Sequence, residues 1–339
     1  MLTHAEGQET TFYKELQNCS GIDFRDERGK VHDMAFILFG VIIGLLRHRD
    51  GVLSSIHRSM VNTHDYICEA LGVEIQRVVS RAQLPRILAK VNLPVFENLL
   101  FSYYKISLSE EEKQWFAGDG KELRGSIEKG DKRGEVLVQL VRHNDRAVLG
   151  QAMYNGLKES EKPCLQQLIQ KTGAQSQKTT ADALHLCPAM TVPIEASGGI
   201  FMIGLKENQK ELLQDMIDHS ECFPPKKEHR TVDKGHGRLE IRDYYLFDVS
   251  EEYFESRWEK SGFRSLLKVQ RNRIDLKINE ESTEIAYYIS NGKATEEHGY
   301  FDAIRNHWSV EVSNHIRDVS LQEDQFRTKK RLFQALWLG

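Results

Sequence analysis

The sequence predicts an α/β protein in which a small helical domain precedes a mixed sheet. Two observations predict this class. From about residue 23 to residue 107 apolar residues recur at three- and four-residue spacing, which is typical of helices. After residue 113 short apolar runs alternate with helix start and stop patterns, which indicates strands and helices in one sheet. We therefore expect a helical domain over residues 1–110, which is a candidate for DNA binding, and a sheet domain over residues 111–339.

The helical domain is predicted from three segments. The apolar run Met34–Leu46 is the strongest in the chain, and it falls short of the roughly 20 residues that span a bilayer, so it predicts a buried core helix. A second helix covers Val61–Leu71. Ser80 is a plausible N-cap for a third helix, which carries Arg81 and Arg86. These two cations could contact phosphate, although a solvated helix face is the commoner explanation for such charges.

The sheet domain is predicted element by element from residue 115 to residue 219. Strands are expected at Trp115–Asp119, Glu135–Val141, Ala147–Tyr154, Lys178–Leu184 and Phe201–Lys206, with helices at Ser160–Gly173 and Asn208–His219. Three strands, a helix, a strand, and then a further strand with its helix are the arrangement of an RNase H-like core. In such a core the first acidic residue lies on the first strand and the second lies near the end of the fourth.

A β-rich insertion is expected over about residues 221–294, because three strand-like runs occupy this part of the chain. They are Leu239–Asp248, Leu266–Ile274 and Thr283–Ser290. A long helix should follow from Thr295, a possible N-cap, to about Asp318.

Composition limits the classes of function. The chain has 339 residues, of which 40% are hydrophobic and 28% charged, so it is neither disordered nor fibrous. The net charge of -4 means that a nucleic-acid surface would need local clusters of Lys and Arg. Five scattered cysteines without a CxxC pair argue against a zinc ribbon or a disulfide framework. The N-terminus does not resemble a signal peptide, so we expect a cytoplasmic protein that does not bind membranes.

Three short blocks carry the carboxylates from which we predict chemistry. Asp119 lies in Ala-Gly-Asp-Gly-Lys, Asp182 in Thr-Ala-Asp-Ala-Leu-His, and Glu311 in Asn-His-Trp-Ser-Val-Glu. Asp119 is expected where a strand ends in a glycine-flanked loop. Three carboxylates can hold two divalent cations, which activate a water or hydroxyl and stabilise the oxygen that leaves a phosphodiester. The blocks therefore predict a metal site that cuts or joins nucleic acid.

Each block also has a plainer interpretation. Asp-Gly after a strand is often only a turn, and Asp182 could be a helix cap. On the last helix, Trp308, Val312 and Ile316 could form a buried stripe opposite a solvated polar face.

The same helix allows a zinc hypothesis. His307, Glu311, His315 and Asp318 fall at spacings that share one face of a helix. The first three could hold zinc, as in a zinc-dependent phosphohydrolase, although the motif is not HExxH.

Several basic and polar residues could guide a nucleic-acid strand to these carboxylates. One set follows the first block, a second stands at a helix N-terminus where backbone amides favour anions, and a third lies in a tight hairpin between two glycines. An ordinary solvated hairpin is an equal explanation for the third set. The candidate DNA-binding residues are Lys121, Arg124 and Ser126, then Lys206, Asn208 and Gln209, then His236 and Arg238.

As a set, the motifs resemble a known family. DGKELRGS, TADALH, IGLKENQKEL, KGHGRLEIR, AYYISN and RNHWSVE occur in an order similar to that of the H-repeat-associated proteins linked to Rhs elements, which are insertion-sequence DDE transposases. The resemblance covers nearly the whole chain. One departure is that the usual Ile-Glu-Asn is Val-Glu-Val here.

The resemblance implies a function and a site. Asp119, Asp182 and Glu311 would be the catalytic triad and would bind two Mg²⁺ or Mn²⁺ ions. The enzyme would cleave transposon ends and join the freed 3′ hydroxyl to target DNA, and it would act as a homodimer on DNA. His307, four residues before Glu311, would contact DNA. The alternative is an inactive relic that only binds DNA.

Overall fold

The computed structural model describes residues 11–48, 52–108, 112–127, 130, 132–156, 160–235, 237–316 and 319. The chain divides into two compact units. The first contains the residues described up to Ser107, together with Glu122–Glu135 and the described residues from Asn314 onward. The second contains Leu108–Lys121 and Val136–Ser313.

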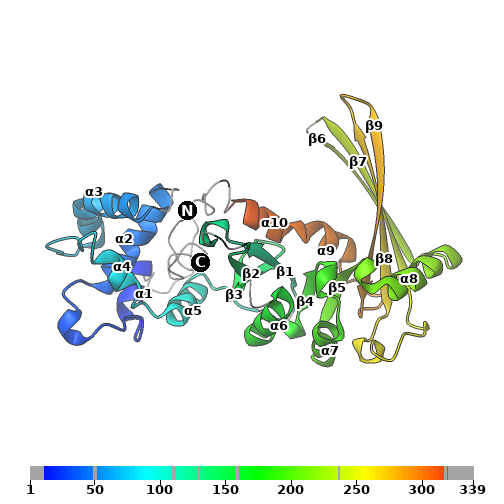
Figure 1. The fold of residues 1–339 in the computed structure, drawn as a ribbon, viewed down its shortest axis with the longest axis horizontal. Coiled ribbons are helices and arrows are strands. Elements are labelled where there is room, and N and C mark those ends of the chain that lie inside the picture. Colours follow the sequence, from blue (N-terminus) through cyan, green and yellow to red (C-terminus); the bar gives the residue numbers. More distant parts are fainter. Residues whose placement is uncertain are drawn as a thin grey trace. The chain divides into compact units, whose positions relative to one another are not determined.

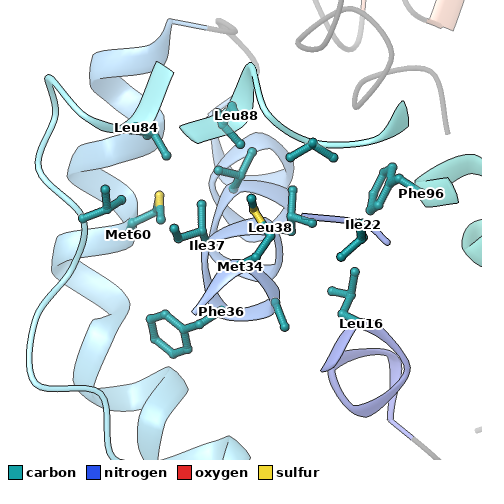
Figure 2. Packing of buried hydrophobic residues seen from close by; sticks show 14 of the residues in the cluster. Leu16, Ile22, Met34, Phe36, Ile37, Leu38, Met60, Leu84, Leu88 and Phe96 are labelled. Carbon is teal, nitrogen blue, oxygen red and sulfur yellow. The ribbon is translucent and has the colours of Figure 1, made fainter. Parts of the chain in front are cut away.

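The first unit contains a small bundle of helices around an apolar core. Its helices are α1 (Phe12–Asn18), α2 (Met34–Arg47), α3 (Leu53–Leu71), α4 (Leu84–Leu88) and α5 (Leu93–Tyr103). The predicted apolar helix α2 lies at the centre of this core. Figure 2 shows Ile37 and Leu38 of α2 among Met60 of α3 and Leu84 and Leu88 of α4. No helix in the described ranges is both long enough and apolar enough to span a bilayer.

Two local predictions for this unit have different outcomes. The second predicted helix is confirmed, and α3 ends where Gly72 adopts a left-handed conformation with φ +65°. The helix start at Ser80 is wrong, because α4 begins at Leu84 and Arg81 lies before it. A helix that started after Ser80 would place Pro85 in its interior, where proline lacks an N–H and its ring clashes with the preceding turn. Ser80 instead closes a turn, and its Oγ accepts a hydrogen bond from Gln83 N at 3.3 Å.

The second unit is built on a mixed sheet, which confirms the α/β class. The described strands form one nine-stranded sheet in the order β3-β2-β1-β4-β5-β9-β8-β7-β6. Strand β4 runs parallel to β1 and to β5, whereas β9 runs antiparallel to β5. The strands are β1 (Trp115–Glu122), β2 (Glu135–Arg142), β3 (Val148–Asn155), β4 (Lys178–Ala181), β5 (Ile200–Leu205), β6 (Lys227–Gly235), β7 (Arg238–Asp248), β8 (Ser265–Asp275) and β9 (Glu280–Ser290).

The expected β-rich insertion extends this sheet. Strands β6 to β9 pair antiparallel in sequence, and β9 joins them to the rest of the sheet through pairs such as Ile203↔Ile289. Figure 1 shows these strands as a long twisted blade. The predicted tight hairpin connects β6 to β7, where Gly235 pairs with Arg238. His236, which comes between these two strands in the sequence, lies outside the described residues.

Helices cover the sheet, and one prediction about them is wrong. They are α6 (Glu161–Thr172), α7 (Pro188–Ala196), α8 (Lys210–Cys222), α9 (Tyr300–Asn306) and α10 (Trp308–His315). The long helix expected from Thr295 begins only at Tyr300, because Gly299 before it adopts φ +71° and cannot belong to a right-handed helix. The helix is also divided at His307. Asp318, its expected end, lies outside the described residues.

Candidate active site

Two of the predicted carboxylates lie on neighbouring parallel strands. Gly118 of β1 pairs with Ala181 of β4, and Asp119 and Asp182 directly follow these two residues. Adjacent strands are about 4.8 Å apart, so the two acidic residues are neighbours across the sheet. The expectation that Asp119 stands in a loop is wrong, since β1 continues through it to Glu122.

Asp182 lies at a strand end and also caps a turn, which are the two placements that the sequence allowed. It directly follows β4, and its Oδ1 also caps the turn Ala183–His185 by accepting a hydrogen bond from Leu184 N at 3.0 Å. The Asp182 side chain remains 53% exposed, so the cap leaves much of the carboxylate open to solvent.

Glu311 is brought to the same region by the packing of α10. Val310 is fully buried in a cluster with Ala117 of β1 and Val141 of β2. Ala117 lies two residues before Asp119 and therefore on the same face of the strand. Glu311, the next residue after Val310, is thus held over the face that bears Asp119. Figure 1 shows α9 and α10 on one side of the β1–β5 part of the sheet and α6 and α7 on the other.

A fourth carboxylate approaches from the opposite side of the sheet. Gly118 and Gly120 share the face of β1 that is opposite Asp119. A Cβ on Gly118 would lie 2.7 Å from Leu165 Cδ1, and a Cβ on Gly120 would lie 2.6 Å from Glu161 Oε2. Glu161 and Leu165 are four residues apart on α6 and so share one face of that helix. The two glycines therefore let α6 approach β1 closely and bring the Glu161 carboxylate next to the backbone that carries Asp119.

Three carboxylates act electrostatically on Asp119. The pKa of Asp119 is raised to about 7, first by burial and then by the negative charge of Glu161, with smaller contributions from Asp182 and Glu311. A hydrogen bond from the Gly120 backbone lowers it in part. Asp182 and Glu311 thus lie within electrostatic range of Asp119, and so does Glu161.

His185 links two of these carboxylates. It is the third residue after Asp182, and its side chain is 1% exposed. Its Nε2 lies 2.9 Å from Glu161 Oε1 and 3.8 Å from Asp182 Oδ1. Its Nδ1 is buried without a hydrogen-bond partner in the described part of the chain. Because carboxylate oxygens accept hydrogen bonds, Nε2 carries the proton that is donated to Glu161.

Two histidines and a threonine form a hydrogen-bonded chain next to the start of α10. Thr180 Oγ1 is 3.0 Å from His143 Nε2 and 2.9 Å from His307 Nδ1, and it donates to the Phe116 carbonyl at 3.3 Å. Since its one proton goes to Phe116, Thr180 accepts a hydrogen bond from each imidazole. Burial is the main reason that the pKa of His143 is lowered to about 3 and that of His307 to about 4. Both rings are therefore neutral near pH 7, and His307 is anchored to the sheet.

Two predicted DNA-binding residues hold the turn that follows β4. Asn208 Nδ2 donates to the Ala183 carbonyl at 2.7 Å, and Gln209 Nε2 donates to the Leu186 carbonyl at 3.0 Å. Their side-chain amides thus fix the backbone beside Asp182, and contact with DNA stays a prediction for both.

A groove opens beside Asp182. It has a volume of about 700 Å³, and its lining includes Asp182, Leu184, Lys206, Asn208 and Tyr287. Lys206 is exposed there, and Glu207 and Glu284 line the groove together with Asp182, so one cation stands among three carboxylates. Contact of Lys206 with DNA stays a prediction.

The other predicted DNA-binding residues are distributed over both units. Lys121 belongs to the second unit, whereas Arg124 and Ser126 belong to the first. Ser126 Oγ donates to the Leu123 carbonyl at 2.6 Å and accepts from Glu135 N at 2.7 Å, so its hydroxyl stabilises a turn. Arg238 stands at the start of β7, 56% exposed and 3.8 Å from Asp275.

The zinc hypothesis gains no support. His307 uses Nδ1 to contact Thr180, and within the ranges that the structure describes no three His, Cys, Asp or Glu side chains are gathered closely enough to hold an ion. The same finding applies to the carboxylates, which share an electrostatic neighbourhood without forming a closed set of ligands. Their donor chemistry nevertheless suits Mg²⁺ or Mn²⁺, because these ions prefer carboxylate oxygens. The plainer interpretation of the helix also fails in part, since Trp308 is 54% exposed and Ile316 40% exposed.

Comparison with known proteins finds similarity to the group of proteins that the motifs indicated. No family model matches it. It is 28% identical to "Putative protein YbfL" of Escherichia coli K12 over 267 residues, which cover 76% of this chain and 69% of that protein. It is also 28% identical to "H repeat-associated putative transposase YhhI" of the same strain, with the same coverage, and 25% identical to "Putative transposase YncI" of E. coli O157:H7 over 73% of this chain and 65% of that protein.

These matches confirm the resemblance that was read from the motifs. The chain is similar in sequence to proteins that are named as H repeat-associated.

Sequence reasoning missed Glu161 and His185. His185 stands in the second block, where a spacing of three residues from Asp182 within a turn could have indicated contact. The only hint of Glu161 was the pair Gly118 and Gly120, because alternating glycines on a strand mark a place where another element approaches closely.

Proposed function

We propose that the chain is a DNA transposase that cleaves transposon ends and transfers the freed 3′ hydroxyl to target DNA. The observation that carries this proposal is the convergence of Asp119, Asp182 and Glu311 from two adjacent parallel strands and the helix that covers them. The printed names of the relatives point to the same class of activity.

The topology supports an RNase H-like core as the framework of this site. In the order β3-β2-β1-β4-β5, strands β4 and β5 run parallel to β1. The carboxylates lie on β1, directly after β4 and on a helix that follows β9. The blade β6–β9 lies between the second and third carboxylates in the sequence, as the insertion of such relatives would.

The residues assigned to the chemistry have distinct roles. Asp119, Asp182 and Glu311 would hold two Mg²⁺ or Mn²⁺ ions, which supply an activated water or hydroxyl and stabilise the oxygen that leaves the phosphodiester. Lys206 attracts the phosphate backbone to the groove beside Asp182. His307, fixed at Nδ1 by Thr180, stays neutral and positions the start of α10. Two copies of the chain would hold the two DNA ends.

The proposal is tested with the purified chain and labelled duplexes taken from the flanks of its own reading frame. Site-specific nicks that leave a 3′ hydroxyl and require MgCl₂ are expected. Asp119→Asn, Asp182→Asn and Glu311→Gln should each reduce nicking to background, because each removes a charged ligand while it keeps the side-chain shape. Glu259→Gln, a change of an exposed residue in a different part of the second unit, is the matched control and should retain activity.

The outcomes separate the proposal from its main alternative. Nicking that ignores all three substitutions, or that proceeds in EDTA, would contradict the assignment. Tight and specific binding of the duplex with no nicking at any MgCl₂ or MnCl₂ concentration would identify an inactive relic that only binds DNA.

A further inference from the structure

The outer part of the blade β6–β9 has two different faces. Side chains alternate across a strand, so Glu240 and Arg242 of β7 lie on one face and Leu239 and Ile241 lie on the other. We call the first the charged face and the second the apolar face. Figure 1 shows this part of the blade extending beyond the helices of its unit.

The charged face is neutralised by ion pairs within the chain. Arg242 Nη1 lies 3.1 Å from Asp233 Oδ2. Arg271 Nη2 lies 3.1 Å from Glu240 Oε2, and its Nη1 lies 3.4 Å from Glu284 Oε2. These charges therefore need no partner from another molecule.

The apolar face carries a patch of exposed and half-buried hydrophobic side chains. Val232 is 59% exposed and Ile285 is 49% exposed. Val232 pairs with Ile241 between β6 and β7, and Leu239 pairs with Ile274 between β7 and β8. Paired residues share a face of the sheet, so these side chains lie together. A contiguous apolar patch on a protein surface marks a site that binds another molecule.

A cation and a carboxylate stand at opposite edges of this patch. Lys234 of β6 pairs with Leu239, Leu239 with Ile274, and Ile274 with Glu281 of β9, so these residues form one row across the apolar face. Lys234 and Glu281 are exposed, and neither has an ion pair among the residues that the structure describes. Three strand spacings separate them, about 14 Å, so they cannot pair with each other in one chain.

A second copy of the chain complements this row. Two sheets that pack face to face keep their strands nearly aligned, about 10 Å apart. A twofold axis parallel to the strands, between the two sheets, places β6 of one copy over β9 of the other and β7 over β8. Lys234 then faces Glu281 of the second copy at both edges of the contact. Leu239 faces Ile274 of the second copy between them.

We propose that the apolar face is a self-association surface, at which two copies of the chain pack their blades face to face about this twofold axis. The order of charges across the row favours a second copy over nucleic acid, because a phosphate backbone would meet the Glu281 carboxylate. Pairing of two copies through the edge of the sheet is disfavoured, since Arg230 and Lys234 are exposed on the edge strand β6.

This inference goes beyond the proposed function and does not depend on it. Neither DNA nor a metal ion takes part in the contact, so the tests below contain neither. Their failure leaves the proposed function standing, and a chain that does not nick DNA could still self-associate through this face.

The first test measures the mass of the full chain by sedimentation velocity over roughly 1–100 µM protein, with the fold checked by circular dichroism. A reversible dimer is expected. Val232→Lys places a charge within the apolar contact and should weaken dimerisation by roughly 100-fold. Val61→Lys is the matched control, because Val61 is 50% exposed on α3 of the first unit, and it should dimerise as the unchanged chain does.

The second test distinguishes this arrangement from any other dimer. Lys234→Glu and Glu281→Lys should each weaken self-association by roughly 10-fold, because the twofold axis turns each change into two like-charge contacts. An equimolar mixture of the two variants should form a mixed dimer about as tightly as the unchanged chain dimerises. One variant then offers two carboxylates to the two ammonium groups of the other.

The outcomes decide the proposal. A chain that stays monomeric throughout this concentration range would overturn it, and so would a dimer that Val232→Lys leaves intact. If Val232→Lys does not fold, the mixture still decides, since its variants change only exposed edge residues. A mixture that associates no more tightly than either variant alone would overturn the twofold contact between Lys234 and Glu281.

Discussion

Protonation of His143 should decide how the stability of the sheet unit depends on pH. His143 is 7% exposed, and burial is the main cause that lowers its pKa to about 3, with a further contribution from His307. In the unfolded chain the pKa of a histidine is about 6.5. Between these two values the unfolded chain binds a proton that the folded chain does not. The free energy of unfolding should therefore fall as the pH falls below about 6.5.

The size of this effect follows from the shift. Between the folded and the unfolded pKa of one group, each pH unit changes the free energy of unfolding by about 1.4 kcal/mol. A change from pH 7 to pH 5 covers about 1.5 units of this range, so His143 should account for about 2 kcal/mol. His307, whose pKa is lowered to about 4, adds a loss in the same direction. A variant at residue 143 alone isolates the first contribution.

The variant is His143→Gln, whose amide can still donate to Thr180 Oγ1 but does not titrate in this range. It should be about 1 kcal/mol less stable than the unchanged chain at pH 7. That difference should shrink or reverse by pH 5. Urea unfolding at pH 7, 6 and 5 measures it through tryptophan fluorescence, because the Trp115 ring stacks on His143 with centroids 6.2 Å apart.

The control is His315→Gln, which changes an exposed histidine and should leave the pH dependence as it is. Parallel losses of stability in the unchanged chain and in His143→Gln between pH 7 and pH 5 would refute the reasoning. They would mean that His143 is not held neutral in the folded protein.

Elements with strong local patterns were predicted well from the sequence. Helix α6 begins after Ser160 and ends at Gly173, which adopts φ +75°, as the cap and stop patterns indicated. Strand β2 follows an apolar run that is interrupted by Gln139, and it is buried on both faces. In such segments the local preference and the tertiary environment agree.

Elements that depend on their neighbours were missed. Helix α7 contains Pro193 in its interior and starts at Pro188, a composition that predicts a loop. It forms because Met190 and Ile194 are buried. Strand β6 is almost entirely polar, and it exists because β7 supplies hydrogen-bond partners along its whole length.

In the candidate site, too, some features could be predicted from the sequence and others could not. The adjacency of Asp119 and Asp182 follows from strand pairing, which the sequence pattern allowed us to anticipate. The approach of Glu161 depends on how closely α6 packs against β1, and no spacing in the sequence encodes that distance. The break in the last helix at His307 also depends on a tertiary contact, because it occurs where the His307 ring binds Thr180.

Two further predictions test the packing that brings the site together. Gly118→Ala should destabilise the chain by about 1–3 kcal/mol, because its Cβ would meet Leu165 Cδ1 at 2.7 Å. In thermal unfolding, the double variant Gly118→Ala/Leu165→Ala should lose less stability than the two single variants lose in sum. Asn208→Ala removes the 2.7 Å hydrogen bond that holds the Ala183 carbonyl, so the turn that carries the second carboxylate should loosen. We expect a severalfold lower Mn²⁺ affinity with about 1 kcal/mol of lost stability. Gln214→Ala breaks an exposed hydrogen bond on α8 and should change neither quantity. Equal Mn²⁺ affinities in Asn208→Ala and Gln214→Ala would show that this turn does not position the site.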